Sequence, residues 1–117
     1  MVQRRLRLRR PQDFERLRHT GNVQRHPFVV MSYTSNTFPH NRYGFITSKH
    51  LGNAVVRNRV RRLLRESVRH RHLDIQSGFD IVFIARPKIV AQPAMVIERT
   101  VSELLRRAGL LMLEEEL

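Results

Sequence analysis

Alternating apolar and polar positions predict two strands in the first half of the chain. Residues 28–34 are rich in β-forming side chains, and residues 42–48 repeat this pattern after the turn-rich stretch 35–41. In the first strand every second residue from Val29 falls on one face, because successive side chains of a strand alternate. We expect the two strands to pair as an antiparallel hairpin.

A helical period follows Gly52-Asn53, which offers an N-terminal cap, and continues to about residue 70. At about 100° per residue, four apolar residues and one serine form one stripe: Val56, Val60, Leu63, Leu64 and Ser67. Polar and basic positions lie on the opposite side or at its flanks: Arg57, Asn58, Arg59, Arg61, Arg62, Arg65 and Arg69. The helix should therefore bury one face and present guanidinium groups on the other.

Three further signals complete the predicted order of elements. A short helix starts at Pro11, residues 79–86 form a nearly continuous apolar run typical of a central strand, and Pro93 opens a last helix that Gly109 ends. The order α-β-β-α-β-α predicts an α+β fold in which helices pack on a small sheet. A strand–helix–strand passage in such a sheet is normally right-handed.

The charge of the chain is concentrated in its first two-thirds. The 117 residues include 22 basic and 10 acidic ones, a net charge of +12, and are expected to form one domain. Residues 1–75 hold 17 basic and four acidic side chains, a net charge of +13. A field of this size favours a polyanionic partner, usually nucleic acid. We expect a basic arm over residues 1–10 and a single nucleic-acid-binding domain over residues 11–117.

Several other classes of protein are disfavoured by the same sequence. The absence of cysteine excludes disulfide and thiol chemistry and favours the cytoplasm, and the apolar runs are too short to span a membrane. Carboxylates are scattered, so a two-metal nuclease centre and a dedicated metal site are not expected. His70-Arg71-His72 could serve an acid/base ribonuclease, but beside so many arginines it is more typical of phosphate contacts.

Residues 44–66, which contain Arg57-Asn58-Arg59, resemble the signature of the bacterial ribonuclease P protein component. Residues 13–14, 28–30 and 80–86 also look like the family pattern, so that the match covers nearly the whole chain. The resemblance implies a two-layer sandwich with a mostly antiparallel sheet and an unusual left-handed βαβ crossover.

The resemblance also implies the function. Proteins of this family bind the catalytic RNA subunit and the 5′ leader of precursor tRNA, and assist endonucleolytic removal of the leader. The catalytic centre and its Mg²⁺ ions would belong to the RNA subunit, so this chain would contribute to a hydrolase without catalytic residues of its own. No protein partner is implied. A structural ribosomal protein and a self-sufficient nuclease are the alternative interpretations.

Two groups of candidate site residues follow from the pattern and the resemblance. Candidates for RNA binding are Lys49, His50, Asn53, Arg57, Asn58, Arg59, Arg61, Arg62, Arg65 and Arg69. Candidates for a leader cleft, where side chains would stack on unpaired bases, are Phe14, Arg18, Met31, Tyr33 and Phe45. The family usually has a second lysine at the position of His50, and aromatic residues where this chain has Arg18 and Met31.

Overall fold

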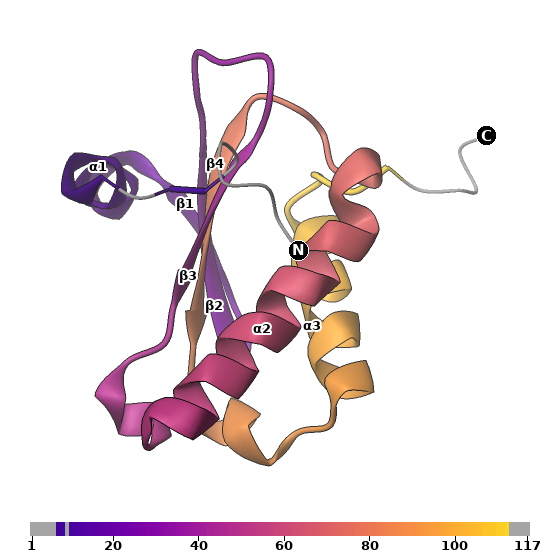
Figure 1. The fold of residues 1–117 in the computed structure, drawn as a ribbon. Helices are drawn as coiled ribbons and strands as arrows, with labels where there is room; N and C mark the ends of the chain where they lie inside the picture. Colours follow the sequence, from indigo (N-terminus) through magenta and orange to yellow (C-terminus); the bar gives the residue numbers. More distant parts are fainter. Residues whose placement is uncertain (1–6, 9, 113–117) are drawn as a thin grey trace.

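Seven regular elements make up the computed structural model of the protein (Figure 1). It describes residues 7, 8 and 10–112, with the backbone but not the side chains of residues 18–20. The elements are α1 (Pro11–Thr20), β1 (Asn22–Arg25), β2 (Val29–Ser35), β3 (Arg42–Ile46), α2 (Ala54–Arg71), β4 (Phe79–Ala85) and α3 (Ala94–Arg107). Short 3₁₀ turns precede α2 and α3 and follow α2. All six predicted elements are confirmed, and β1 is an additional strand that the apolar pattern did not predict.

The sheet order is β1-β2-β4-β3, so the predicted hairpin between β2 and β3 is wrong. Strand β4 lies between them, antiparallel to β2 and parallel to β3, with Phe83 opposite both Met31 and Phe45. The physical reason is the composition of β4, which has apolar side chains on both faces. Such a strand is best buried in the middle of the sheet, with a strand on either side of it. The sheet is nevertheless mostly antiparallel, as expected, because β1 and β2 also pair in that sense.

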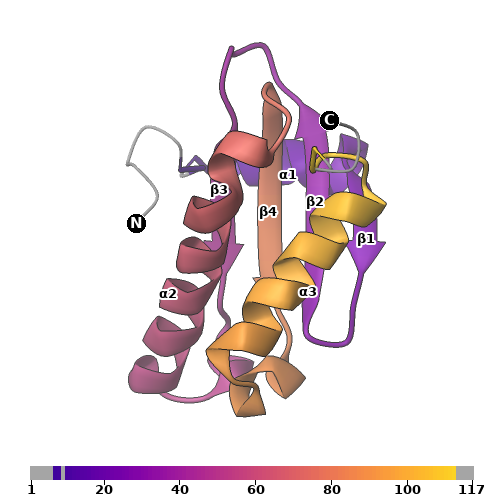
Figure 2. The ribbon, with the colours of Figure 1, turned by 90° about the vertical axis from the view of Figure 1, so that its right-hand side faces the viewer.

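Helices α2 and α3 lie side by side on one face of the sheet, and α1 lies on the other (Figures 1 and 2). The main core lies between the sheet and this helix pair, and the apolar stripe of α3 is fully buried in it. These residues are Ile97, Val101, Leu104 and Leu105. The α+β class is thus confirmed. Helix α2 connects the parallel pair β3 and β4, and the left-handed sense of that crossover stays a prediction.

A second, smaller apolar cluster holds α1 against the opposite face of the sheet. Leu8, Leu17 and Val82 form it, with the partly buried Phe14 and Ile84 packed against them. The backbone N–H of Leu8 donates to the carbonyl of Tyr43 at 2.6 Å, so this residue of the predicted arm is attached to β3. Residues 1–6 and 9 of the arm lie outside the described residues. In the described part of the chain, no helix is long and apolar enough to cross a membrane.

Candidate nucleic-acid interface

The start of α2 is fixed by its cap. The side-chain oxygen of Asn53 accepts the backbone N–H of Val56 at 3.0 Å, as expected for an N-cap residue. Gly52 has a φ of +139°, a conformation that residues with a Cβ rarely adopt. Lys49 and His50 are exposed in the 3₁₀ turn just before this cap. The cap thus places these two side chains beside the first turns of α2, where Arg57-Asn58-Arg59 lies.

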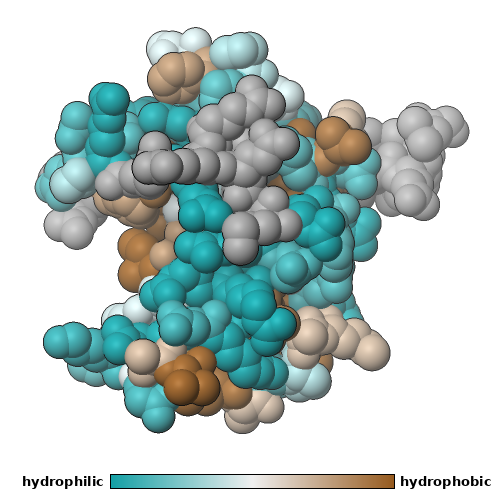
Figure 3. Space-filling model, viewed as in Figure 1, coloured by the Kyte–Doolittle hydropathy of each residue, from teal (hydrophilic) through white to brown (hydrophobic). Residues whose placement is uncertain are grey.

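The basic side chains of α2 spread over its outer side, and the space-filling view shows this region as hydrophilic (Figure 3). Asn58, Arg62 and Arg69 are exposed on the crest of the helix. Arg59 reaches the segment that precedes α3, where its Nη2 donates to the carbonyl of Gln92 at 3.2 Å. The predicted division of α2 into an apolar and a basic side is therefore confirmed. Whether the basic side chains bind RNA stays a prediction.

Arg61 and Arg65 lean from α2 toward β3. Arg61 donates to the hydroxyl of Thr47 through Nη2, and to Oδ1 of Asn58 at 2.8 Å through Nη1. The guanidinium carbon of Arg65 lies 5.9 Å from the centroid of the Phe45 ring, a cation–π arrangement. These contacts hold the two guanidinium groups in place before any ligand binds.

Positive charge is poorly compensated along this side of the molecule. Burial lowers the pKa of Arg65, and repulsion from Arg7 and Arg61 lowers it further. The Nε atoms of Arg57 and Arg65 are buried without a hydrogen-bond partner. Glu66, the single acid of α2, is bound to Arg69 at 2.9 Å. Because the guanidinium groups stay charged at neutral pH, an approaching polyanion would relieve this repulsion.

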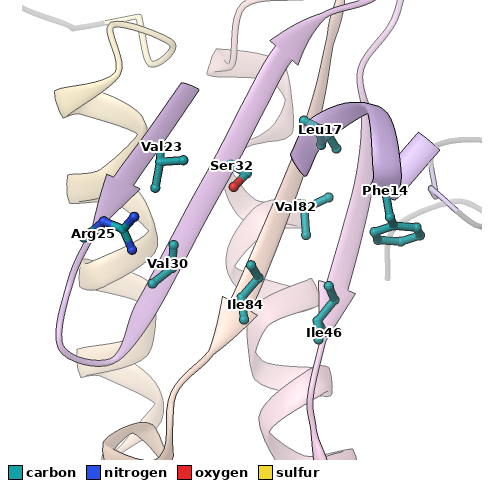
Figure 4. Close-up of a pocket in the computed structure, with 9 residues that line it drawn as sticks. All are labelled: Phe14, Leu17, Val23, Arg25, Val30, Ser32, Ile46, Val82 and Ile84. Carbon is teal, nitrogen blue, oxygen red and sulfur yellow. The ribbon is translucent and has the colours of Figure 1, made fainter. Parts of the chain in front are cut away.

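A cleft of about 290 Å³ lies on the sheet face that α1 only partly covers (Figure 4). We call it the open-face cleft. Phe14 and Leu17 of α1 form one wall, and the floor comes from residues of the four strands. The strand residues are Val23, Arg25, Val30, Ser32, Ile46, Val82 and Ile84. The cleft is mostly aliphatic, with Phe14 as its one aromatic ring and Arg25 as its one cation among the described lining residues.

Of the four predicted cleft residues whose side chains the structure describes, only Phe14 lines this cleft. Met31 is completely buried under the helices, and Tyr33 and Phe45 pack against the same main core. The ring of Phe45 stacks on Phe83 at 5.8 Å between centroids. The prediction that these three residues line a cleft with Phe14 is therefore wrong. Arg18 belongs to α1, but its side chain lies outside the described part of the structure.

Side-chain alternation explains this correction. In β2, Val29, Met31 and Tyr33 share one face, as the sequence pattern predicted. The helices cover that face, whereas Val30 and Ser32 face the open side. Aromatic character and family position favour residues that lie on the covered face. Taking the alternate residues of β2 as cleft candidates would have found the correct ones.

The carboxylates and histidines do not assemble a catalytic centre in the described residues. No group of three or more His, Asp or Glu side chains there could hold a metal ion. Nδ1 of His70 lies 2.8 Å from Glu98 of α3, while Nδ1 of His72 lies 2.8 Å from the hydroxyl of Tyr43. The two histidines thus have different partners on different elements and form no acid/base pair.

Known proteins resemble this chain in sequence over most of its length. The ribonuclease P family model matches residues 2–109. The ribonuclease P protein component of Thermoanaerobacter sp. (strain X514) is 38% identical over 105 residues, which cover 90% of either chain. That of Roseiflexus sp. (strain RS-1) is 40% identical over 111 residues, covering 94% of this chain and 91% of the relative.

Two solved structures share the fold over most of their length. An RNase P protein from Staphylococcus aureus matches with a TM-score of 0.85 and 29% identity, covering 91% of this chain and 97% of that one. The RNase P protein from Thermotoga maritima matches with a TM-score of 0.80 and 28% identity, covering 86% of this chain and 96% of that one. The additional strand and the sheet order are thus part of a known architecture.

Proposed function

Because the chain belongs to the ribonuclease P protein family, we propose that α2 binds the RNA subunit of ribonuclease P and that the open-face cleft receives the 5′ leader of precursor tRNA. The chain is a protein component of ribonuclease P, an endoribonuclease of tRNA 5′ processing. Family membership does not support the alternative of a structural ribosomal protein. We further propose that the assembly acts in the cytoplasm.

The observation that carries the proposal is the charge of α2. Six arginines lie between residues 57 and 69, against the single acid Glu66. Structured RNA supplies closely spaced phosphates, and each phosphate neutralised by an arginine releases condensed counterions. Arg61 is already held by Thr47, just after β3, and Arg65 by Phe45 of β3, so less side-chain freedom is lost when they bind. We therefore place the main RNA contact on the outer side of α2.

The open-face cleft suits a single-stranded segment better than a duplex. Its floor is apolar, so the flat faces of unpaired bases can lie on it, and Phe14 offers one ring for stacking. Arg25 at its margin offers one cation for the backbone. With a single aromatic ring, the cleft should bind leaders with weak sequence preference.

We assign the chemical step to the RNA. The described residues do not fit a dedicated Mg²⁺ site, and Asp13 and Asp80 are both engaged by Arg42. No step of hydrolysis is therefore assigned to a side chain of this protein. The Mg²⁺ of the reaction would be held by the RNA subunit and the substrate, and the protein would lower the Mg²⁺ requirement by supplying positive charge near them.

The proposal is tested by incubating the protein with precursor tRNA, with and without a ribonuclease P RNA, over a range of Mg²⁺ concentrations. We expect cleavage only when the RNA is present, and at lower Mg²⁺ when the protein is added. Cleavage by the protein alone would show a self-sufficient nuclease. An unchanged Mg²⁺ dependence would contradict the electrostatic role.

Binding to the RNA subunit tests the assignment of α2. Arg57→Ala should weaken binding by about 1–3 kcal/mol, because a charge-assisted contact is lost. Arg99→Ala, which removes the same charge from an exposed position of α3, is the matched control. If about six phosphates are neutralised, the affinity should fall with a log–log salt slope near −5. Equal affinities of the two variants, or a slope shallower than about −2, would contradict the proposal.

A further inference from the structure

A basic pocket, separate from the basic side of α2, lies at the end of the molecule opposite the start of that helix. It opens between the start of α1, the end of β2 and the loop that joins β2 to β3, and its volume is about 340 Å³. The ribbon shows this loop at one end of the fold and the first turn of α2 at the opposite end (Figure 1). We call it the loop-end pocket and define it by Arg10, Arg16, Phe38 and Arg42, with the hydroxyls of Ser35 and Thr37 at its margin.

A buried carboxylate fixes two of the three arginines of the loop-end pocket. Asp80 has no exposed surface and accepts hydrogen bonds from Arg42 at 3.0 and 2.8 Å, and also from Nη2 of Arg16. Asn36 donates to the same carboxylate at 2.9 Å. The guanidinium groups are thus held in fixed positions, while the Arg16 side chain keeps 38% of its surface exposed.

The exposed aromatic ring of Phe38 lies at the mouth of the same pocket. Phe38 is 43% exposed, and its ring centroid lies 5.5 Å from that of His40. The guanidinium carbon of Arg42 lies 4.7 Å from the ring centroid, and the backbone N–H of Phe38 donates to Oδ1 of Asn36 at 2.8 Å. Both contacts lead back to Asp80, so the ring is held in place although it is open to solvent.

The charges of the pocket favour an anion. Three guanidinium groups, of Arg10, Arg16 and Arg42, face two carboxylates, of Asp13 and Asp80, which leaves one net positive charge. Arg10 is the exposed member of the three. A phosphate beside Arg10 and an aromatic base on Phe38 would satisfy both halves of the pocket, since every base offers a π-face for stacking.

We propose that the loop-end pocket is a second RNA contact, which binds one unpaired nucleotide with its phosphate at Arg10 and its base stacked on Phe38. This inference rests on the proposed function, because it takes RNA as the partner. With α2 at one end and this pocket at the other, the protein would contact two separate segments of RNA. Neither the basic side of α2 nor the open-face cleft includes these residues.

The first test uses the lack of tryptophan in the native chain. In the Phe38→Trp variant, the single indole reports on stacking through quenching of its fluorescence, and it retains a ring for Arg42. The probe is a single-stranded adenylate dodecamer. Leu73→Trp, at an 89% exposed position outside the pocket, is the matched control. We expect quenching several times stronger at position 38. Equal quenching of the two variants would overturn the proposal.

The second test measures affinity for the same oligonucleotide. Phe38→Ala should weaken binding about five-fold or more, because a stacking contact is lost, whereas Phe38→Tyr should bind like the native chain. Arg10→Gln should reduce the salt slope by about one. Denaturation curves that match the native protein would show that the variants fold. Native affinity in folded Phe38→Ala and a native salt slope in Arg10→Gln would overturn the proposal.

Binding of the native chain to ribonuclease P RNA, measured in parallel, separates the two hypotheses. If the native chain does not bind this RNA, the proposed function fails. If the native chain binds it and Arg57→Ala weakens that binding, the proposed function stands, and the loop-end pocket is then judged by the Phe38 and Arg10 variants alone.

Discussion

Substituting Gly44 tests how the wall of the open-face cleft is built. Gly44 lies on β3 beneath the ring of Phe14, and a Cβ added to it would lie 2.8 Å from Cε1 of that ring and 3.1 Å from Cζ. Real Cβ atoms do not approach other atoms so closely, so Gly44→Ala must displace the ring. Overpacking of this kind typically costs about 1–3 kcal/mol. We therefore expect the variant to be destabilised, although alanine is otherwise favoured over glycine within a strand.

A double-mutant cycle isolates the clash with Phe14. When Phe14→Ala removes the ring, the closest remaining neighbour of the new Cβ is Cγ2 of Val82 at 3.2 Å, a contact that a shift of a few tenths of an ångström relieves. In that background Gly44→Ala should be neutral, or stabilising by about 0.5–1 kcal/mol, because glycine loses more backbone entropy on folding. The two substitutions should therefore show a coupling free energy of at least about 1 kcal/mol.

Urea denaturation of the native chain, the two single variants and the double variant measures this coupling. Binding of precursor tRNA and mature tRNA, measured with a ribonuclease P RNA present, then tests the cleft. Gly44→Ala should weaken binding of the precursor more than that of the mature tRNA, because the displaced ring narrows the open-face cleft. Additive free energies of unfolding would refute the packing argument, and equal losses for both tRNAs would refute the role of the cleft.

Three further predictions concern stability. Asp80→Asn should destabilise the protein by about 2–4 kcal/mol in denaturant, because the guanidinium of Arg42 would lose its buried partner, and an effect below about 1 kcal/mol would contradict the role of Asp80 as anchor. Asn53→Ala should cost about 1 kcal/mol through loss of the cap of α2, whereas Asn53→Asp should retain most of the stability. Burial raises the pKa of Tyr43 to about 12 from an ordinary value of 10, so the folded state retains the proton longer than the unfolded state. The neutral Tyr43 thereby contributes up to about 2–3 kcal/mol to the free energy of unfolding, fully below pH 10 and less as the pH rises toward 12. Tyr43→Phe should remove this part of the loss of stability at alkaline pH. An identical pH profile of stability for the variant and the native chain would contradict this prediction.

Elements with strong local signals were predicted well from the sequence. Helix α2 has an apolar stripe, a capping asparagine and a length of 18 residues, so its period is unambiguous. Helix α1 begins with Pro11, and Pro93 is the N-cap residue of α3. Helix α3 is followed by Gly109 in the left-handed conformation. Strand β1 was missed because it has four residues, three of them polar, and lies at the edge of the sheet.

The pairing of strands could not be read from local signals. Residues 35–41 have the composition of a tight turn, and a turn between two apolar strands usually makes a hairpin. In this fold the strands separated by that turn are instead divided by β4, which follows them by more than thirty residues. The deciding factor is the burial of both faces of β4, a tertiary effect that depends on all three strands together.

The candidate site was predicted in part for the same reason. The basic side of α2 follows from one helix and its period, so it could be located without knowledge of the sheet. The open-face cleft depends on which face of the sheet α2 and α3 cover, and the sequence contains no direct signal for that choice. Among the candidates with described side chains, Phe14 lines the cleft because α1 lies on the open face of the sheet.

The open-face cleft and the loop-end pocket share one wall, since both depend on where α1 lies. In the register of β3 and β4, Arg42 pairs with Asp80, and Gly44 pairs with Val82 two residues further along. The ion pairs of Asp80 therefore lie next to the Gly44–Val82 pair, on which the ring of Phe14 rests. Helix α1 buries little apolar surface of its own, with Leu17 its one buried apolar side chain among those described. The bond from Arg16 to Asp80 therefore contributes much of what fixes the orientation of α1. One buried acid thus positions two cations of the loop-end pocket and, through Arg16, also helps to position the helix that forms one wall of the open-face cleft. A change at Asp80 should accordingly affect leader binding and the loop-end pocket together, whereas a change at Arg10 or Phe38 should affect the pocket alone.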